Sequence, residues 1–261
     1  MELAGIGRVV FWEGGSLWLA LITGVTEFHS HHAIQLSLPL TGVAQFMETG
    51  EDWVPYVGAV ITPDVPHAFR APGKVVANIL FEPESIAGRS VLSRFRVPGV
   101  AELSAAEVAT LSAPLSAAYF AGEDDDHLIS LARRAVATIS ETDVMSAPTD
   151  ARVLRAIAAI RRRIDEPITL PDLAHEVGLS PGRLRHLFVA ETGVSFRAFV
   201  LWERLNKALA LGFGGGSWTE AAHAANFADS AHLSRTCRRM FGLAPTSARI
   251  EHPEATGRLT A

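Results

Sequence analysis

Cysteine is almost absent from this chain of 261 residues. Cys237 stands alone, which excludes intramolecular disulfides and zinc sites built from cysteine clusters. No apolar run approaches the roughly 20 residues that a membrane-spanning helix needs. The segment MELAGIGRVVFWEGG at the start lacks the basic residues and apolar core of a secretory signal, and the sequence contains no glycine-rich phosphate loop or nucleophile elbow. We therefore expect a cytoplasmic protein with no membrane partner.

Positive charge is scarce in the first half of the chain and concentrated in the second. Residues 1–145 contain 8 Lys and Arg against 17 Asp and Glu, a net charge of −9. Residues 146–261 contain 15 against 11, a net charge of +4. Because affinity for nucleic-acid phosphates comes from Arg and Lys, the second half is the candidate DNA-binding region. The acidic first half is expected to stay off the duplex.

The first hundred residues alternate short β-type runs with glycine and proline turns. The runs occupy residues 16–23, 33–40, 43–49, 58–63 and 75–83. Strands at this spacing predict a small sandwich or barrel.

Helical patterns begin at about residue 101. Two alanine-rich segments, 103–122 and 127–140, predict helices, and MSAPTD at 145–150 predicts a linker where the charge changes sign. The next helix has one apolar face, formed by Val153, Ile157, Ile160 and Ile164. Its arginines are expected on the solvated side; they are Arg155, Arg161, Arg162 and Arg163.

One pattern then occurs twice, at 169–188 and 217–242: a short helix, a tight turn, and a capped helix that carries arginines. In the first copy Gly178 supplies the positive φ of the turn, and Ser180 caps the second helix with Pro181 at its first position. In the second copy Asn226 occupies the turn and Asp229 caps the second helix.

The spacing of the two copies favours a paired DNA reader over two accidental helix pairs. Equivalent caps lie about 50 residues apart, with one helix from Ser195 to about Leu211 between them. Two reading helices joined in this way could enter successive major-groove segments on one face of DNA, about 34 Å apart.

Residues 150–250 closely resemble the DNA-binding domain of AraC/XylS-family transcription regulators. The resemblance rests on LPDLAHEVGLSPGRLRHLFVAETGVSF, SWTEAAHAANF and FGLAPTSAR, with Arg204, Ala208 and Leu211 between the first two. The chain departs from the family pattern at Asn226-Phe227, where Gly-Phe is usual, at Ala221-Ala222, and at Gly212. The Gly214 to Gly216 run should loosen the joint between the two units.

The resemblance implies which residues contact DNA. Those of the first unit are Pro181, Gly182, Arg183, Arg185 and His186; those of the second are Ser230, Ala231, His232, Ser234, Arg235 and Arg238. Arg can bind guanine O6 and N7 with two hydrogen bonds, so Arg185 and Arg235 are the strongest candidates for base contacts.

The N-terminal half has a histidine signature of its own. Period-2 spacing places His29 and His31 on one strand face with Gln35 further along, and His67 follows in a later turn. The segment resembles the small cupin barrel of such regulators, with Gln35 where the cupin metal motif has Glu. A divalent transition metal, a metal-free pocket for an organic ligand, and no ligand are the three alternatives. His32 is expected on the surface.

We therefore predict an α+β protein of two domains. Residues 1–100 are expected to form a cupin-like effector-sensing β-barrel, 101–145 a helical dimerisation and linker segment, 150–250 the bipartite helix-turn-helix domain, and 251–261 a flexible tail. The predicted function is a sequence-specific transcription regulator, an activator by resemblance, that responds to a small molecule or metal. Its expected partners are double-stranded DNA, RNA polymerase, the effector and a second copy in a homodimer.

The alternative function is a metal-dependent cupin enzyme with an accessory DNA-binding domain. Gln35 argues against it, because an amide in place of a carboxylate weakens the metal site and supplies no base. No catalytic residue is predicted.

Overall fold

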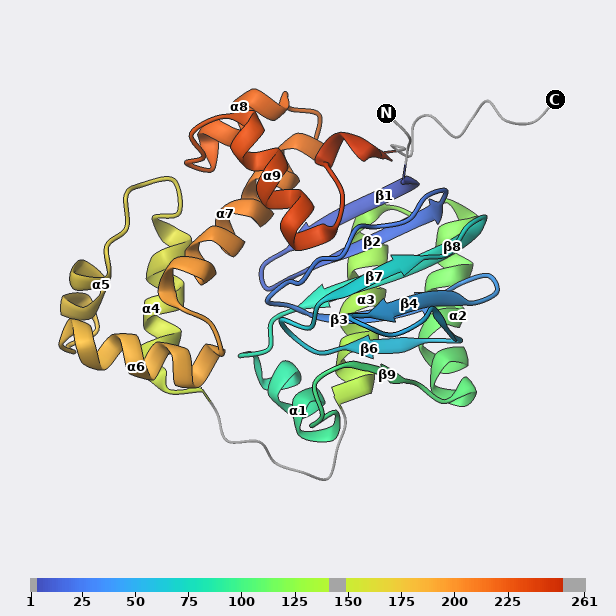
Figure 1. Ribbon diagram of the computed structural model, residues 1–261, viewed down its shortest axis with the longest axis horizontal. Helices are drawn as coiled ribbons and strands as arrows, with labels where there is room; N and C mark the ends of the chain where they lie inside the picture. Colours follow the sequence, from blue (N-terminus) through green and yellow to red (C-terminus); the bar gives the residue numbers. More distant parts are fainter. Residues whose placement is uncertain (1–3, 141–148, 251–261) are drawn as a thin grey trace.

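The computed structural model describes residues 4–140 and 149–250 (Figure 1). Most of the predicted linker at 145–150 and the whole predicted tail at 251–261 lie outside the described residues. The prediction of an α+β protein with two domains is confirmed. The strands of the first domain form two sheets, however, and not one closed barrel.

Within residues 4–140 and 149–250, ten strands make up the two sheets. They are β1 (Gly5–Trp12), β2 (Gly15–Ile22), β3 (Ile34–Pro39), β4 (Ala44–Glu48), β5 (Val54–Tyr56), β6 (Ala59–Ile61), β7 (His67–Arg70), β8 (Lys74–Phe81), β9 (Val100–Glu102) and β10 (Ala248–Ile250). The larger sheet has the order β10-β1-β2-β8-β3-β6-β9, and the smaller has the order β5-β4-β7. The last strand, β10, comes from the C-terminal end of the described chain and pairs in parallel with β1.

The described helices are assigned as follows. They are α1 (Ile86–Arg94), α2 (Ala105–Ala121), α3 (Asp125–Ser140), α4 (Ala151–Arg162), α5 (Leu170–Glu176), α6 (Pro181–Thr192), α7 (Phe196–Phe213), α8 (Trp218–Ala224) and α9 (Ser230–Phe241). Helices α2 and α3 lie against the larger sheet, whereas α4, α5 and α6 lie beside the sheets (Figure 1).

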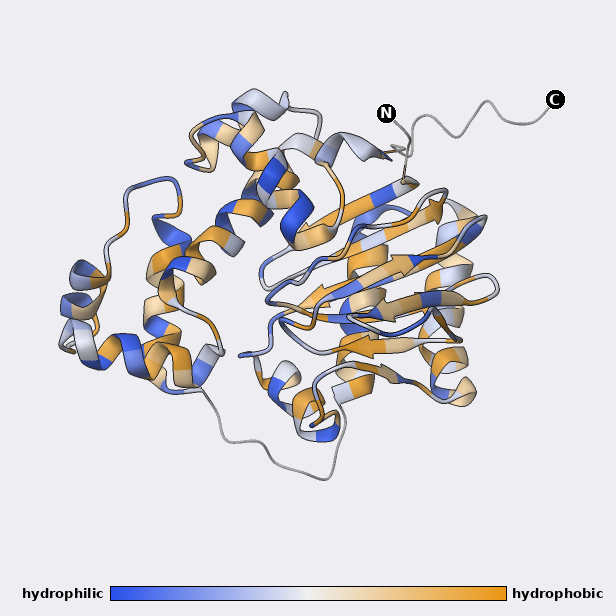
Figure 2. Cartoon of the chain, in the orientation of Figure 1, coloured by the Kyte–Doolittle hydropathy of each residue, from blue (hydrophilic) through white to orange (hydrophobic). Residues whose placement is uncertain are grey.

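The two faces of the larger sheet are covered by different parts of the chain. Leu17 and Leu19 of β2 belong to the core that the sheet forms with α2 and α3. Trp18, between them, points the other way and packs with Phe213 of α7 and Phe241 of α9. The smaller sheet covers the rest of that second face through Phe46 and its neighbours. Hydrophobic residues accordingly dominate the strands in Figure 2.

The local geometry of both helix-turn-helix units agrees with the sequence prediction. Gly178 and Asn226 have φ values of 73° and 58°, so both turns use the left-handed region. The side chain of Ser180 accepts a hydrogen bond from the backbone N–H of Arg183, and that of Asp229 accepts one from the backbone N–H of His232. These caps fix where each candidate reading helix begins.

The second unit is docked on the N-terminal domain, which the sequence did not predict. Trp202 of α7 stacks on Phe241 with 5.7 Å between ring centroids, and Trp18 lies 4.9 Å from the same ring. The core formed there contains residues of β1, β2, β8, α7, α8 and α9. The described domains therefore share one apolar interface in addition to the β1–β10 pairing.

Loss of a buried side chain from helix α7 should lower the stability of the fold strongly. Leu205 is fully buried, whereas Leu211 on the same helix is 42% exposed. We expect Leu205→Ala to lower the free energy of unfolding by about 2–5 kcal/mol, because it leaves a cavity that the core cannot fill. Leu211→Ala should change it by less than about 0.5 kcal/mol. Urea unfolding of the full chain measures both values, and equal losses would contradict the assigned packing.

Candidate nucleic-acid interface and effector site

The predicted contact residues of the first unit lie on the outward side of α6. Leu184 and Phe188 are fully buried and hold the helix to its core. The exposed residues between and before them are Pro181, Gly182, Arg183, Arg185 and His186. The N-terminal turn of α6 therefore presents two guanidinium groups and one imidazole to solvent.

The second unit presents a similar surface on α9. Leu233 and Cys237 are fully buried, so the opposite side of the helix faces outward. Its predicted contact residues are exposed or half-buried; they are Ser230, Ala231, His232, Ser234, Arg235 and Arg238. The ring of His232 packs edge-on against Phe227, with 5.1 Å between centroids.

The guanidinium groups on the two candidate reading helices differ from those of α4. Within the described residues, Arg185 and Arg235 make no side-chain hydrogen bond or ion pair with the chain. Arg162, the last residue of α4, and Arg163, its C-cap, both pair with Glu176. The arginines of α6 and α9 therefore keep their donors available for an external anion.

Three histidines of the N-terminal domain meet at one point. His29 and His67 form an isolated antiparallel β-bridge, and His31 lies two residues beyond His29. One ligand atom from each of the three imidazoles lies within 4.8 Å of the others. All three are buried, with exposures of 7%, 3% and 0% for His29, His31 and His67.

Each imidazole is oriented by a backbone carbonyl two residues away. Nδ1 lies 2.8 Å from the Glu27 carbonyl in His29, 2.9 Å from the Ala33 carbonyl in His31, and 2.9 Å from the Val65 carbonyl in His67. A carbonyl only accepts, so Nδ1 carries the proton and Nε2 keeps its lone pair in His29 and His67. His31 faces an oxygen at both ring nitrogens, the Ala33 carbonyl and Oε1 of Gln35, and donates to one of them when neutral. Nε2 of His67 is buried and has no hydrogen-bond partner among the described residues.

Burial keeps these three imidazoles neutral. It lowers the pKa of His29 to about 3, with repulsion from His31 as the next cause. It also lowers the pKa of His31, and it holds the pKa of His67 well below its usual range. A neutral imidazole is the form that ligates a metal ion.

Gln35 lies beside the histidines, as the sequence pattern suggested. Its Oε1 is 3.0 Å from Nε2 of His31, and its Nε2 donates to Oδ1 of Asn78 at 3.2 Å. His32, in contrast, is not the surface residue that was expected. It is 5% exposed, and its Nε2 lies 3.0 Å from a carboxylate oxygen of the buried Glu84. The expectation for His32 was wrong because its loop turns inward against α7, where its ring meets Phe199.

The C-terminal end of α9 lies directly against the histidine loop. Gly242, the C-cap of α9, has φ of 69°, and its carbonyl accepts a hydrogen bond from the backbone N–H of Glu27 at 2.8 Å. A cavity of about 100 Å³ adjoins this contact and is lined by His29, Gln35 and Phe241 among others. It is smaller than the roughly 300–1,000 Å³ of pockets for drug-sized ligands.

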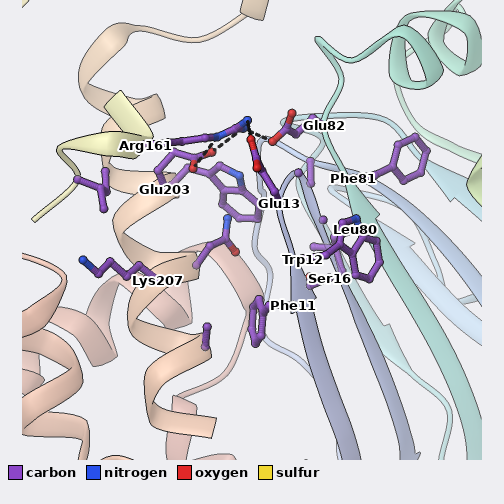
Figure 3. Close-up of a pocket in the computed structure, with 17 residues that line it drawn as sticks. Phe11, Trp12, Glu13, Ser16, Leu80, Phe81, Glu82, Arg161, Glu203 and Lys207 are labelled. Atoms are coloured by element: carbon purple, nitrogen blue, oxygen red, sulfur yellow. Dashed lines mark hydrogen bonds and ion pairs between the residues drawn. The ribbon is translucent and has the colours of Figure 1, made fainter. Parts of the chain in front are cut away.

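A second cavity, of about 230 Å³, separates the β1–β2 turn from α4 and α7 (Figure 3). Arg161 reaches across it, bonding Glu82 of the N-terminal domain and Glu203 of α7, whose Oε2 is 3.2 Å from Nε. Arg161 is 21% exposed, so its expected place on the solvated side of α4 was wrong. Burial raises the pKa of Glu82 to about 7, with Glu84 and Glu203 adding repulsion against the opposing effect of Arg161.

Among the comparisons with known proteins, the family model matches only the C-terminal part of the chain. Residues 173–250 match the family model of a helix-turn-helix domain. Over 187 residues the chain is 30% identical to the transcriptional activator NphR of Rhodococcus sp, covering 70% of this chain and 53% of NphR. Over 101 residues it is 32% identical to the HTH-type transcriptional regulator YidL of Escherichia coli (strain K12), covering 38% of this chain and 34% of YidL. The chain thus spans about half the length, or less, of these curated relatives.

Solved structures with the same two-domain arrangement include ToxT of Vibrio cholerae. An apo variant of ToxT aligns with a TM-score of 0.59 at 11% identity, over 89% of this chain and 94% of that chain. A form of ToxT with bound unsaturated fatty acid aligns with a TM-score of 0.54 at 11% identity, over 88% and 92% of the two chains. At this identity the likeness shows the fold alone. None of the described helices has the length and apolarity needed to cross a bilayer.

The position of Glu82 between the domains predicts a pH dependence of stability. Its pKa is raised from 4.5 to about 7 on folding, so its contribution is fully present below pH 4.5 and is lost as the pH rises through 7. We expect the urea midpoint of the native protein to fall between pH 4.5 and pH 7 by more than that of Glu82→Gln.

Glu13→Gln is the matched control for this measurement. Glu13 lines the same cavity, but its side chain is 84% exposed. This variant should keep the native pH dependence. An unchanged slope in Glu82→Gln would mean that other groups govern stability in this range.

Proposed function

We propose that this protein is a sequence-specific DNA-binding transcription regulator of the AraC type. Residues 173–250 match the family model of a helix-turn-helix domain, and the chain shares the fold of ToxT. The observation that carries the proposal is the pair of outward helices whose arginines lack partners within the described residues. Arg185 on α6 and Arg235 on α9 each come from a capped helix with a fully buried opposite side. Two such helices suit two successive contacts on one duplex.

The residue roles follow from position on each helix. Arg185 and Arg235 bind guanine edges through paired donors, the strongest common form of base recognition. The remaining base-edge candidates are Gly182, His186, Ser230, Ala231 and His232. The candidates for backbone contacts are Pro181, Arg183, Ser234 and Arg238. Gly182 and Ala231 offer little side chain, so we expect few direct base contacts beside the two arginines.

The length of α7 supports a fixed phase between the two reading helices. Its 18 residues span about 27 Å at 1.5 Å per residue, and it packs against both units. Successive major grooves on one face of DNA are about 34 Å apart. A single helix of this length therefore sets the two units at a separation of the same order.

The fold and the distribution of charge support a separate role for each part of the chain. Residues 1–100 sense the effector, 101–145 provide linkage and dimerisation, and 150–250 read DNA. The effector is a small molecule or a metal ion, and the cavity of about 100 Å³ beside His29 favours a small one. That ToxT has a fatty-acid-bound form supports an effector in this kind of fold.

Activation through RNA polymerase is the proposed mode of regulation, since the relative NphR is named a transcriptional activator. A homodimer is the proposed assembly on DNA. We assign no enzymatic activity to the chain, because Gln35 contributes an amide to the histidine cluster where a reaction would need a base.

The proposal predicts the cost of removing one reading arginine. Arg235→Ala should weaken binding to the mapped operator by about 1–3 kcal/mol and relax the preference for one base. The control is Arg134→Ala, which removes the same charge from the exposed side of α3. It should leave operator affinity unchanged, because α3 lies in the acidic half.

Fluorescence anisotropy with operator and scrambled DNA, at fixed salt, measures these affinities. Equal losses on both DNAs would place Arg235 on the phosphate backbone. No loss on either would remove α9 from the interface.

A further inference from the structure

We propose that His29, His31 and His67 bind one divalent transition-metal ion, and that the bound ion locks the second helix-turn-helix unit against the N-terminal sheets. The inference rests on the proposed function, since it supplies the regulation of that DNA reader. The donor atoms determine the class of ion, and the contact that α9 makes with the histidine loop identifies the regulated element.

The three imidazoles are already prepared as ligands. Each Nδ1 is held by a backbone carbonyl at 2.8–2.9 Å, which leaves Nε2 as the metal ligand in His29 and His67, and in His31 when its proton lies on Nδ1 rather than on the Nε2 that faces Gln35. Metal-bound histidines typically have their other ring nitrogen fixed in this way. All three histidines of the cluster share this contact between Nδ1 and a backbone carbonyl, which packing alone does not require.

The buried cluster contains a polar atom without a hydrogen-bond partner among the described residues. Nε2 of His67 is buried without a hydrogen-bond partner within the described residues, although a buried acceptor without a partner is costly. The ring centroids of His29 and His67 are only 4.3 Å apart, and both rings lie within 6 Å of His31. When the Nε2 lone pairs of neighbouring imidazoles lie close together with no hydrogen-bond donor between them, a bound cation stabilises them.

The spacing fits one ion after a small contraction. Adjacent ligands at about 2.0–2.1 Å from a metal lie roughly 3.0–3.4 Å from each other. Gln35 Oε1 is already 3.0 Å from His31 Nε2, as a fourth ligand would be. The histidine donors lie within 4.8 Å of one another, so binding must draw the widest pair together by up to roughly 1.4 Å.

The donor set selects the class of ion. Neutral imidazoles suit Zn²⁺, Cu²⁺, Ni²⁺ and Fe²⁺, and they bind Mg²⁺ or Ca²⁺ poorly because those ions prefer oxygen. Asp64 is an acidic group close to the cluster: its backbone N–H donates to the His31 carbonyl at 2.8 Å, and its carboxyl interacts with His31 through space.

Glu27 connects the histidine cluster to α9. Its carbonyl orients Nδ1 of His29 at 2.8 Å, and its N–H donates to the carbonyl of Gly242 at 2.8 Å. A Cβ added at Gly242 would lie 2.3 Å from that Glu27 carbonyl and 2.6 Å from Nδ1 of His29. Any movement of His29 toward the other two histidines therefore acts on the peptide that holds the end of α9.

The aromatic rings above the cluster make a second connection. His31 lies 6.2 Å from both Trp202 of α7 and Phe241 of α9, centroid to centroid. An ion that fixes the position of His31 also fixes the imidazole ring against which Trp202 and Phe241 lie. Since coupling is reciprocal, docking of α9 raises the affinity for the ion by the same factor that the ion raises docking.

Binding is tested first with Zn²⁺ alone on the metal-free full chain, by titration calorimetry and elemental analysis. We expect one Zn²⁺ per chain, and an affinity at least about tenfold lower in His67→Ala and His29→Ala. His127→Ala, an exposed histidine of α3, is the matched control and should bind as the native chain does. Absence of stoichiometric Zn²⁺, or equal binding by all variants, overturns the metal site.

Coupling to α9 is tested with a pair of glycine variants. Gly242 and Gly193 are both C-caps in the left-handed region, with φ of 69° and 79°, but a Cβ at Gly193 meets nothing within 4 Å. Alanine therefore brings similar backbone strain at both sites, and only Gly242→Ala disturbs the contact with Glu27. We expect Gly242→Ala to weaken Zn²⁺ binding by about tenfold or more and Gly193→Ala to leave it unchanged. Equal affinities overturn the coupling.

Hydrogen exchange of the native chain provides a readout that needs no substitution. Zn²⁺ should slow exchange in residues 24–32 and at the end of α9, and leave α6 of the first unit unchanged. Uniform slowing, or none, contradicts the proposed lock. DNA binding of metal-free His29→Ala is measured alongside. If this variant keeps its affinity for DNA, the proposed DNA-binding function stands whatever the zinc result. If no form of the chain binds DNA, the proposed function itself is refuted.

Discussion

The apolar contact between the second helix-turn-helix unit and the larger sheet is the constraint on which the rest of the structure depends. Phe241 stacks between Trp202 and Trp18, one from the linking helix and one from β2. The chain then continues into β10, which adds a strand beside β1. The unit that carries α9 is therefore held to the larger sheet at two places, the aromatic contact and the β1–β10 pairing.

Local sequence signals predicted the features that depend on neighbouring residues. Asn226 occupies the left-handed region that its turn requires, and the caps at Ser180 and Asp229 start their helices where expected. The packing of α2 and α3, however, joins them to the first domain's core, which charge and composition alone could not indicate. Short elements without a strong pattern, such as α1 and β10, were also missed.

Contacts between distant residues account for most of what the sequence did not predict. Arg161 and Glu82 are 79 positions apart, and His32 and Glu84 are 52 apart, so no local pattern relates them. The histidine cluster was predictable only in part. The His29–His31 spacing was visible, but only the β-bridge from His29 to His67 brings the third imidazole to the other two.

The central claim is that two helix-turn-helix units in one chain read one duplex in fixed phase. Hydroxyl-radical footprinting of the full chain on its operator tests this most directly. The account predicts two protected segments on one face of the DNA, centred about 10 base pairs apart. A single protected segment, or two segments on opposite faces, would contradict it.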